Sequence, residues 1–248
     1  IFYRNLFSGA KFSQMFFNAK PHRCFKSKYG NTFKYGLHAP SECKNFWYQW
    51  IPNKQHFVDY EELDANTVSE IRNILTAMMN KFGKPIVIKN LANSLRLRLI
   101  YQIFPNSKII FIRRDPLETA ISICKARRNK GVDSQSIWSI SPPSLKHFNP
   151  TSEYELIVKQ IFLIEKQILS DKKLFPSSNF HYLSYDQFVN NTKPEIETLR
   201  NFIQPDLAYR KNIIFSGIKR KSSYQNDQKI LDAFRSEIDK LNWETYEI

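Results

Sequence analysis

The feature that most constrains the fold is the stretch KIIFIRRDPLETAISICKARR, residues 108–128. It opens with a β-branched and aromatic run at 109–112, which predicts a buried β-strand. Pro116 follows after a short polar turn, and its fixed φ angle and missing N–H suit the first turn of a helix. The helix continues with apolar residues spaced to bury one face: Leu117, Ala120, Ile121 and Cys124. A strand, a turn and a helix in this order are typical of an α/β sheet, where an anion binds beyond the strand end.

A βαβ unit is predicted around this stretch. Residues 86–88 read as a short buried strand, 93–104 as a crossover helix and 108–113 as the next strand, an order that implies parallel pairing. Each strand is followed by a basic side chain, Lys89 in one case and Arg114 in the other. Because the carboxyl ends of parallel strands meet at one edge of a sheet, these two cations predict an anion site there.

Apolar periodicity predicts the remaining elements. They are helices over 67–82, 153–175, 192–202 and 230–238, and a strand over 179–185. Two helices are expected to begin with capping boxes, Thr67 with Glu70 and Thr192 with Glu195, and Gly83 is expected to end the first. Residues 131–152 contain three prolines and predict a long loop of the kind that covers a substrate cleft.

Arg96 and Arg98 are expected on the polar side of the crossover helix. A basic run follows on the next helix, and most of it is expected to be a solvated face or to steer an acidic ligand: Lys125, Arg127, Arg128 and Lys130.

The composition suits a globular protein that attracts anions. The 248 residues suit one large α/β domain, and the usual size of about 100–200 residues per domain allows one or two. A hydrophobic share of 42% and an aromatic share of 15% supply a core and exclude disorder. The net charge of +14 favours nucleic acid, acidic membranes, nucleotides or polyanionic glycans as partners. Because no RRM, zinc-finger or basic-zipper signature accompanies the charge, nucleic acid is not the expected partner.

The cysteines and the hydropathy bear on the compartment. Cys24, Cys43 and Cys124 are widely spaced, which predicts neither a disulfide framework nor a zinc site, although one disulfide stays open. No apolar run reaches about 18 residues, so no transmembrane segment is expected. These features favour a cytoplasmic location, with the Golgi lumen as the alternative for a eukaryotic chain. The chain begins with Ile1 rather than Met, so a targeting segment is not judged from it.

The string Arg114-Asp115-Pro116 followed by Ser122, with FPNSK before the strand, resembles the sulfotransferases that use 3′-phosphoadenosine 5′-phosphosulfate (PAPS). The resemblance implies a three-layer α/β/α fold with a mainly parallel sheet, related to the P-loop hydrolases. It implies a single sulfotransferase domain over residues 1–248. The family's loop for the 5′-phosphosulfate is not found: NLFSGAK at 5–11 lacks its arginine and threonine pair. We therefore expect the N-terminal strand and this loop upstream of Ile1, and weak nucleotide binding without them.

The resemblance also implies roles for single residues. An arginine and a serine eight residues apart hold the 3′-phosphate in the family, which assigns this role to Arg114 and Ser122. A strand-end lysine faces the sulfuryl group, and Lys89 would there offset the charge that develops as the S–O bond breaks. Tyr185 would contact the adenine. Lys221 and Ser223, in a basic turn near the C-terminus, would close over the 3′-phosphate side.

The general base stays open between two residues. The cytosolic branch of the family has a histidine two residues after the strand-end lysine, but this chain has Leu91 there. Glu42 or His38 is therefore expected to take the proton of the acceptor. The acceptor is a hydroxyl or an amine, and the nearby aromatic residues Trp47, Tyr48 and Trp50, which would stack on a sugar, slightly favour a carbohydrate. The reaction requires no metal.

A plainer interpretation exists for each residue. Arg114 could pair with Asp115 or Glu118 on the surface, and Lys89 could be a solvated lysine. Tyr185 could anchor a strand end, the turn at 221–223 could be solvated, and the aromatic residues could belong to the core. Two other functions stay open: a kinase-like nucleotide-binding enzyme on the same fold, and a non-catalytic basic protein that binds polyanions.

Overall fold

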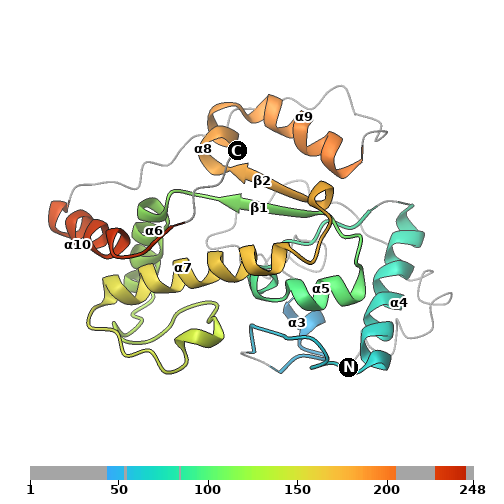
Figure 1. The fold of residues 1–248 in the computed structure, drawn as a ribbon, viewed down its shortest axis with the longest axis horizontal. Helices are drawn as coiled ribbons and strands as arrows, with labels where there is room; N and C mark the ends of the chain where they lie inside the picture. Colours follow the sequence, from blue (N-terminus) through green and yellow to red (C-terminus); the bar gives the residue numbers. More distant parts are fainter. Residues whose placement is uncertain (1–43, 53–54, 84, 205–226, 244–248) are drawn as a thin grey trace. The chain divides into compact units, whose positions relative to one another are not determined.

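The computed structural model of the chain describes residues 44–52, 55–83, 85–204 and 227–243. This described part is a mixed α/β structure, mostly helical, with a small parallel sheet of two strands (Figure 1). The chain divides into two compact units, Ile1–Pro105 and Asn106–Ile248. The single domain expected from the sequence stays a prediction.

The first unit is built from helices and extended segments. Its helices are α3 (Lys44–Trp47), α4 (Ala65–Phe82), the 3-10 helix η3 (Leu91–Leu95) and α5 (Leu97–Ile103). Helices α3, α4 and α5 share a hydrophobic core with the extended segment between α3 and α4. Its buried residues are Trp47, Ile51, Val58, Val68, Ile71, Leu75, Leu99 and Ile103. Arg72 of α4 donates to the carbonyl oxygens of Gln102 and Ile103, at 2.7 and 2.6 Å. These bonds satisfy carbonyls that the end of α5 leaves without a helical partner.

Helix α4 confirms the prediction for 67–82 but begins differently. Asp64 is its N-cap, and the Asp64 carboxylate accepts from the backbone N and the Oγ1 of Thr67, at 2.9 and 2.8 Å. The predicted capping box of Thr67 and Glu70 is therefore wrong, because an aspartate three residues earlier takes the cap position. Gly83 ends the helix as predicted, with a left-handed φ of 58°.

The segment 85–90 differs from the prediction of a buried strand over 86–88. It pairs with no strand of the described structure, and Val87 has a relative exposure of 74%. An apolar run becomes a strand only when another strand supplies its backbone hydrogen bonds, and a sequence pattern does not name that partner. The βαβ unit predicted over 86–113 is therefore not formed in the described residues.

The predicted crossover helix is divided between η3 and α5, and Arg96 lies between them. Arg96 was expected on a polar face, but its exposure is 1%. Its Nε and Nη2 donate to the carbonyl oxygens of His56 and Gln55, at 3.1 and 2.7 Å, and burial lowers the pKa of the guanidinium. Arg98 is partly exposed and pairs with Asp59. Arg96 is therefore an internal link between segments rather than part of a solvated face.

The sheet of the second unit joins two strands that are far apart in the sequence. Strand β1 (Ile109–Arg113) pairs in parallel with β2 (Phe180–Ser184), so that Arg113 lies opposite Ser184. The chain between them runs through α6 (Pro116–Asn129) and α7 (Glu153–Lys172), a crossover long enough for parallel pairing. Both strands were predicted, but β1 was expected to pair with residues 86–88.

Helices contact both faces of this sheet. On one face, Nε of Arg113 lies 3.1 Å from Oε2 of Glu165 on α7. Burial raises the pKa of the Glu165 carboxyl, and Arg113 opposes part of that rise. On the other face, the rings of His181 and Phe202 on α9 (Thr192–Ile203) lie 5.2 Å apart. Figure 1 shows α7 and α9 on opposite sides of the two strands.

Helices α6, α7 and α10 (Gln228–Asp239) pack around a second core, as their apolar faces predicted. Its buried residues are Ala120, Ile121, Cys124, Ile157, Val158, Ile161 and Phe234. The prediction for α9 is confirmed in extent but not at its start. Asn191 holds the N-cap position without a side-chain bond, and Thr192 donates through Oγ1 to the carbonyl of Phe188. The second predicted capping box is therefore also wrong.

Arg127 corrects the expectation of a solvated basic face at the end of α6. Its exposure is 0%, and Nε lies 3.2 Å from Oε1 of Glu153. Its terminal nitrogens donate to the carbonyl oxygens of Asp133, Ser134 and Ser136, at 2.9, 3.2 and 2.6 Å. These bonds connect the start of the predicted loop over 131–152 to α6 through a buried cation. The same loop contains a short 3-10 helix, η4 (Pro143–Leu145).

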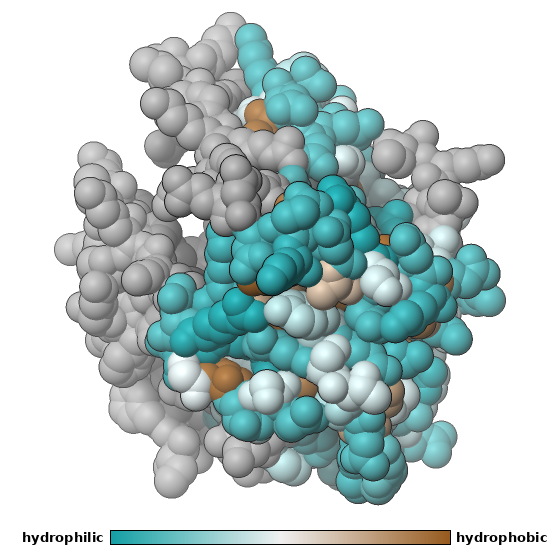
Figure 2. Space-filling view, turned by 90° about the vertical axis from the view of Figure 1, so that its left-hand side faces the viewer, coloured by the Kyte–Doolittle hydropathy of each residue, from teal (hydrophilic) through white to brown (hydrophobic). Residues whose placement is uncertain are grey.

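The surface of the described residues is mainly hydrophilic on the side that Figure 2 presents, with small scattered apolar areas. No helix among the described residues combines the length and the apolarity needed to cross a membrane.

Candidate functional site

The parallel register places two predicted site residues together. Because Arg113 and Ser184 are opposite each other at the carboxyl ends of β1 and β2, Arg114 and Tyr185 are the first residues beyond both strands. The Cζ atom of Arg114 lies 4.9 Å from the centroid of the Tyr185 ring. This distance is within the range of a cation–π contact. The candidate site is therefore at the edge of the sheet where ligands of α/β proteins bind.

Arg114 has a second contact, with Glu118. Its Nε lies 3.0 Å from Oε2 of Glu118, four residues later, and the side-chain exposures of the two residues are 25% and 9%. Among the described residues, no hydrogen bond is formed by the terminal nitrogens of Arg114. The two terminal nitrogens, Nη1 and Nη2, form a fork that can bind one phosphate through two parallel hydrogen bonds, a bidentate contact. The arginine is therefore held from one side and can present its fork to an anion.

The start of α6 contributes little to anion binding through its backbone. Pro116 has no N–H, and the N–H of Glu118 donates to Oδ1 of Asp115 at 2.9 Å. The Asp115 carboxylate thus occupies the position that a bound anion takes at other helix N-termini. Positive charge at this corner comes chiefly from the side chain of Arg114.

Ser122 lies on the same face of α6 as this ion pair. Glu118 and Ser122 are four residues apart within α6, and residues at this spacing are neighbours on a helix surface. Ser122 is exposed, so its hydroxyl is accessible to a ligand. Ser122 is therefore a neighbour of Glu118, the residue that contacts Arg114 just before the helix.

Lys89 lies in the first unit, at the end of the extended segment 85–90, and is exposed. The next residue, Asn90, is buried and accepts from the backbone N of Ala92 at 2.9 Å, which fixes the start of η3. The backbone that bears Lys89 is thus anchored on its C-terminal side.

Four other predicted site residues lie outside the described part of the chain. They are Glu42 and His38, the candidate bases, and Lys221 and Ser223, the candidate phosphate contacts. Their roles stay predictions.

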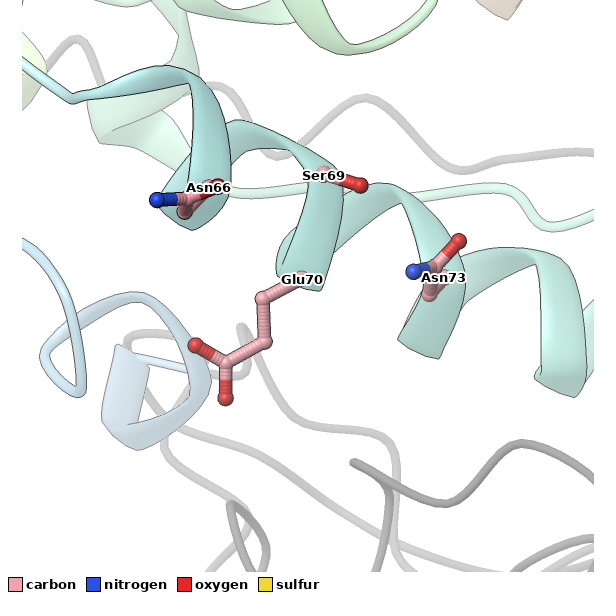
Figure 3. Close-up of a pocket in the computed structure, with 4 residues that line it drawn as sticks. All are labelled: Asn66, Ser69, Glu70 and Asn73. Carbon is pink, nitrogen blue, oxygen red and sulfur yellow. The ribbon is translucent and has the colours of Figure 1, made fainter.

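The aromatic residues near α3 are divided between the core and the surface. Trp47 is buried, so the interpretation as a core residue holds for it. Trp50 donates from Nε1 to Oε2 of Glu70 at 3.0 Å. Glu70 also lines a pocket of about 230 Å³ on one face of α4, with Asn66, Ser69 and Asn73 (Figure 3). None of these four residues was predicted for the nucleotide, and this pocket plays no part in the candidate site.

Glu118 was not predicted as a functional residue, only as one possible surface partner of Arg114. The available signal was the spacing of four residues between an arginine and a glutamate across a helix start. The sequence does not reveal that Glu118 is buried at 7% exposure while it makes this contact.

Comparison with known protein families finds one that matches this region. The model of the sulfotransferase family matches residues 77–208, which is more than half of the chain and includes Lys89, Arg114, Ser122 and Tyr185. The chain belongs to the sulfotransferase family. The resemblance stated from the sequence is confirmed. Comparisons with curated proteins and with solved structures found no match.

Membership of this sulfotransferase family implies PAPS as the sulfuryl donor. The candidate site fits such a donor, because the phosphate groups of PAPS bind cationic hydrogen-bond donors. Arg114 offers such donors at the strand ends, since no described residue binds its terminal nitrogens. Among the described residues, no group of histidine, cysteine and acidic side chains is arranged to hold a metal ion. The expectation that the reaction requires no metal is not tested by this finding.

Proposed function

We propose that this sulfotransferase transfers the sulfuryl group of PAPS to a hydroxyl or amine acceptor, with Arg114 and Ser122 as the anchor for the 3′-phosphate. The observation that supports this best is the position of Arg114. It follows a parallel strand, lies against Tyr185 and has terminal N–H groups that no residue of the described part of the chain binds. Ser122 adds an exposed hydroxyl two turns along the same helix face.

The proposed reaction is a single in-line displacement. The acceptor oxygen or nitrogen forms a bond to sulfur, and the bond between sulfur and the oxygen bridging to phosphate breaks. The acceptor proton passes to the general base, Glu42 or His38, and 3′-phosphoadenosine 5′-phosphate (PAP) leaves with the electron pair of the broken bond. Lys89 would balance the charge on the bridging oxygen, and fixed geometry would supply much of the rate.

Further parts of this proposal concern the fold and the ligands. We propose the three-layer α/β/α arrangement of P-loop proteins, with α7 and α9 as helices of the two outer layers. Tyr185, Lys221 and Ser223 are proposed to complete the nucleotide site. A carbohydrate is our preferred acceptor because of the aromatic residues near α3, and the cytoplasm our preferred location.

The test is thermal unfolding of the chain with PAP and with ADP, which lacks the 3′-phosphate. A ligand at about a hundred times its dissociation constant adds roughly 2.7 kcal/mol to the stability of the native state. For a chain of this size that corresponds to a rise of about 5–10 °C in Tm. We expect this rise with PAP, a smaller one with ADP, and loss of the difference in Arg114→Ala.

The matched control is Lys130→Ala. Lys130 follows the other end of α6, about 20 Å from Pro116 at the usual rise of roughly 1.5 Å per residue, and its replacement removes the same charge. This variant should retain the preference for PAP. Equal shifts with PAP and ADP would favour a general nucleotide-binding enzyme, and the absence of any shift would contradict the proposal for this chain.

A further inference from the structure

We propose that Glu118 is a positioning residue of the nucleotide site: it holds the Arg114 guanidinium against Tyr185 so that the terminal nitrogens of Arg114 face the 3′-phosphate. This inference rests on the proposed function and assigns roles to two residues beyond it. The observation behind it is a chain of contacts, Glu118 to Nε of Arg114 at 3.0 Å and Cζ of Arg114 to the Tyr185 ring at 4.9 Å.

The effect of Glu118 on phosphate binding depends on which nitrogen of the Arg114 guanidinium it contacts. A carboxylate on the terminal nitrogens would compete with phosphate for the same donors. Glu118 binds Nε instead, and therefore leaves the fork of Nη1 and Nη2 available. A flexible arginine side chain loses considerable rotational freedom when it binds an anion, and a prior contact at Nε removes part of that cost.

Burial makes Glu118 a firm support. Its side chain has an exposure of 9%, whereas the neighbouring acid, Asp115, is exposed and caps the helix through Oδ1. A buried oxygen acceptor is costly to leave without a donor, and Nε of Arg114 donates to Oε2 of Glu118, so this contact favours the conformer in which Arg114 lies over Glu118. Asp115 thus fixes the helix start, while Glu118 fixes the arginine.

Tyr185 closes the other side of Arg114. The guanidinium lies over the face of the ring, so an adenine cannot stack on this same face while Arg114 is in place. We therefore assign to Tyr185 a role in orienting Arg114, and any contact with adenine would use the ring edge, the hydroxyl or the opposite face. The charge of Arg114 needs only the aromatic face, so phenylalanine should replace tyrosine in this role.

The experiment separates the reach of the Glu118 side chain from its charge. Calorimetry would give the dissociation constants of PAP and of adenosine 5′-monophosphate, which differ only by the 3′-phosphate. In the ratio of the two dissociation constants, the contributions of the adenosine and the 5′-phosphate cancel. Partial unfolding of a variant weakens both ligands by the same factor and therefore leaves the ratio unchanged. The variants are Glu118→Gln, which keeps the acceptor oxygen at the same reach, and Glu118→Asp, which keeps the charge but is shorter.

We expect Glu118→Asp to lower the preference for PAP by about tenfold or more, the size of one charge-assisted hydrogen bond. Glu118→Gln should keep the preference within a few-fold. Tyr185→Phe should also keep it, and Tyr185→Ala should reduce it. Glu197→Ala is the matched control, because Glu197 forms a pair with Arg200 on α9, and its loss should leave the ratio unchanged.

Two results would overturn the inference. One is a Glu118→Asp variant that folds and keeps the preference of the wild type. The other is an equal loss of the preference for PAP in Glu118→Gln and Glu118→Asp, since the length of the side chain would then not explain the loss. If the unmodified chain shows no preference for PAP, the proposed nucleotide site itself is wrong. This outcome is seen in the wild type, and so differs from the two variant results that would overturn the role of Glu118 alone.

Discussion

Replacing Arg127 by methionine should destabilise the second unit by about 3–5 kcal/mol, because it removes a fully buried cation and leaves the largely buried Glu153 carboxylate only the half-exposed Arg128 as a partner. The three carbonyls that Arg127 also binds belong to exposed residues of the loop after α6. Water can hydrogen-bond to these carbonyls once the loop opens, so the loss of each of these three bonds adds little to the expected destabilisation. Methionine retains much of the aliphatic volume, which keeps the cavity contribution small.

The neighbouring residue supplies a matched control. Arg128 binds the same carboxylate, with Nη2 3.3 Å from Oε2 of Glu153, but its side chain is 48% exposed. An exposed ion pair contributes about 0–1 kcal/mol, so Arg128→Met should cost no more than that. The two variants remove the same charge from adjacent positions and differ mainly in burial. A difference of at least about 2 kcal/mol between them is therefore expected.

Urea denaturation followed by tryptophan fluorescence would measure both variants, and hydrogen exchange of residues 132–141 would locate the effect. Arg127→Met should lower Tm by about 6–20 °C, at roughly 2–4 °C for each kcal/mol. Exchange in the loop should rise in this variant, because Val132 donates to the carbonyl of Arg127 and the loop is tied to its side chain. Equal stabilities of the two variants, within about 1 kcal/mol, would refute the assignment of Arg127 as a buried link.

Two further predictions concern other parts of the fold. Burial raises the pKa of the Glu165 carboxyl above its ordinary 4.5, so the folded state binds this proton more tightly than the unfolded state does. The protonated group therefore stabilises the fold at low pH, and this contribution is lost as pH rises from 4.5 through the raised pKa. Glu165→Gln should therefore gain stability relative to the wild type over that pH interval, and a pH-independent difference in unfolding free energy would contradict this. Gly83 has a φ of 58° with no atom within 4 Å of an added Cβ, so Gly83→Ala should cost about 1–2 kcal/mol through the backbone alone. Gly83→Asn should cost less in the same denaturation assay, and equal losses would show that the left-handed conformation is not the cause.

The predictions from sequence were most successful where a residue acts on its own backbone. Pro116 begins α6, and Gly83 ends α4, because proline restricts φ and glycine permits a positive φ. The apolar run at 109–112 and the alternating segment 179–185 also became strands, because each found the other as a partner. Where two capping residues compete within one turn, local rules do not choose between them: Asp64 rather than Thr67 caps α4.

The candidate site was predicted in its residues but not in its arrangement. The string from Arg114 to Ser122 predicted an anchor for the 3′-phosphate, and the family match covers these residues. The sequence did not indicate that Arg114 contacts Tyr185, because that contact depends on the pairing of β1 with β2, across about seventy residues. It also did not indicate that Glu118 is buried beside Arg114.

The sequence by itself determined the family, most of the helices, both strands of the described sheet and the place of Arg114 directly after β1. Only the tertiary structure decided which strand pairs with β1 and which arginines are internal. Arg96 and Arg127 have the same sequence signature as exposed arginines, but both are buried. Arg96 binds backbone carbonyls about forty residues away, and Arg127 binds Glu153 on α7 as well as carbonyls of the loop after α6. The physical reason is that strand pairing and burial depend on neighbours far away in the chain, whereas turns and helix ends depend on the residues that form them.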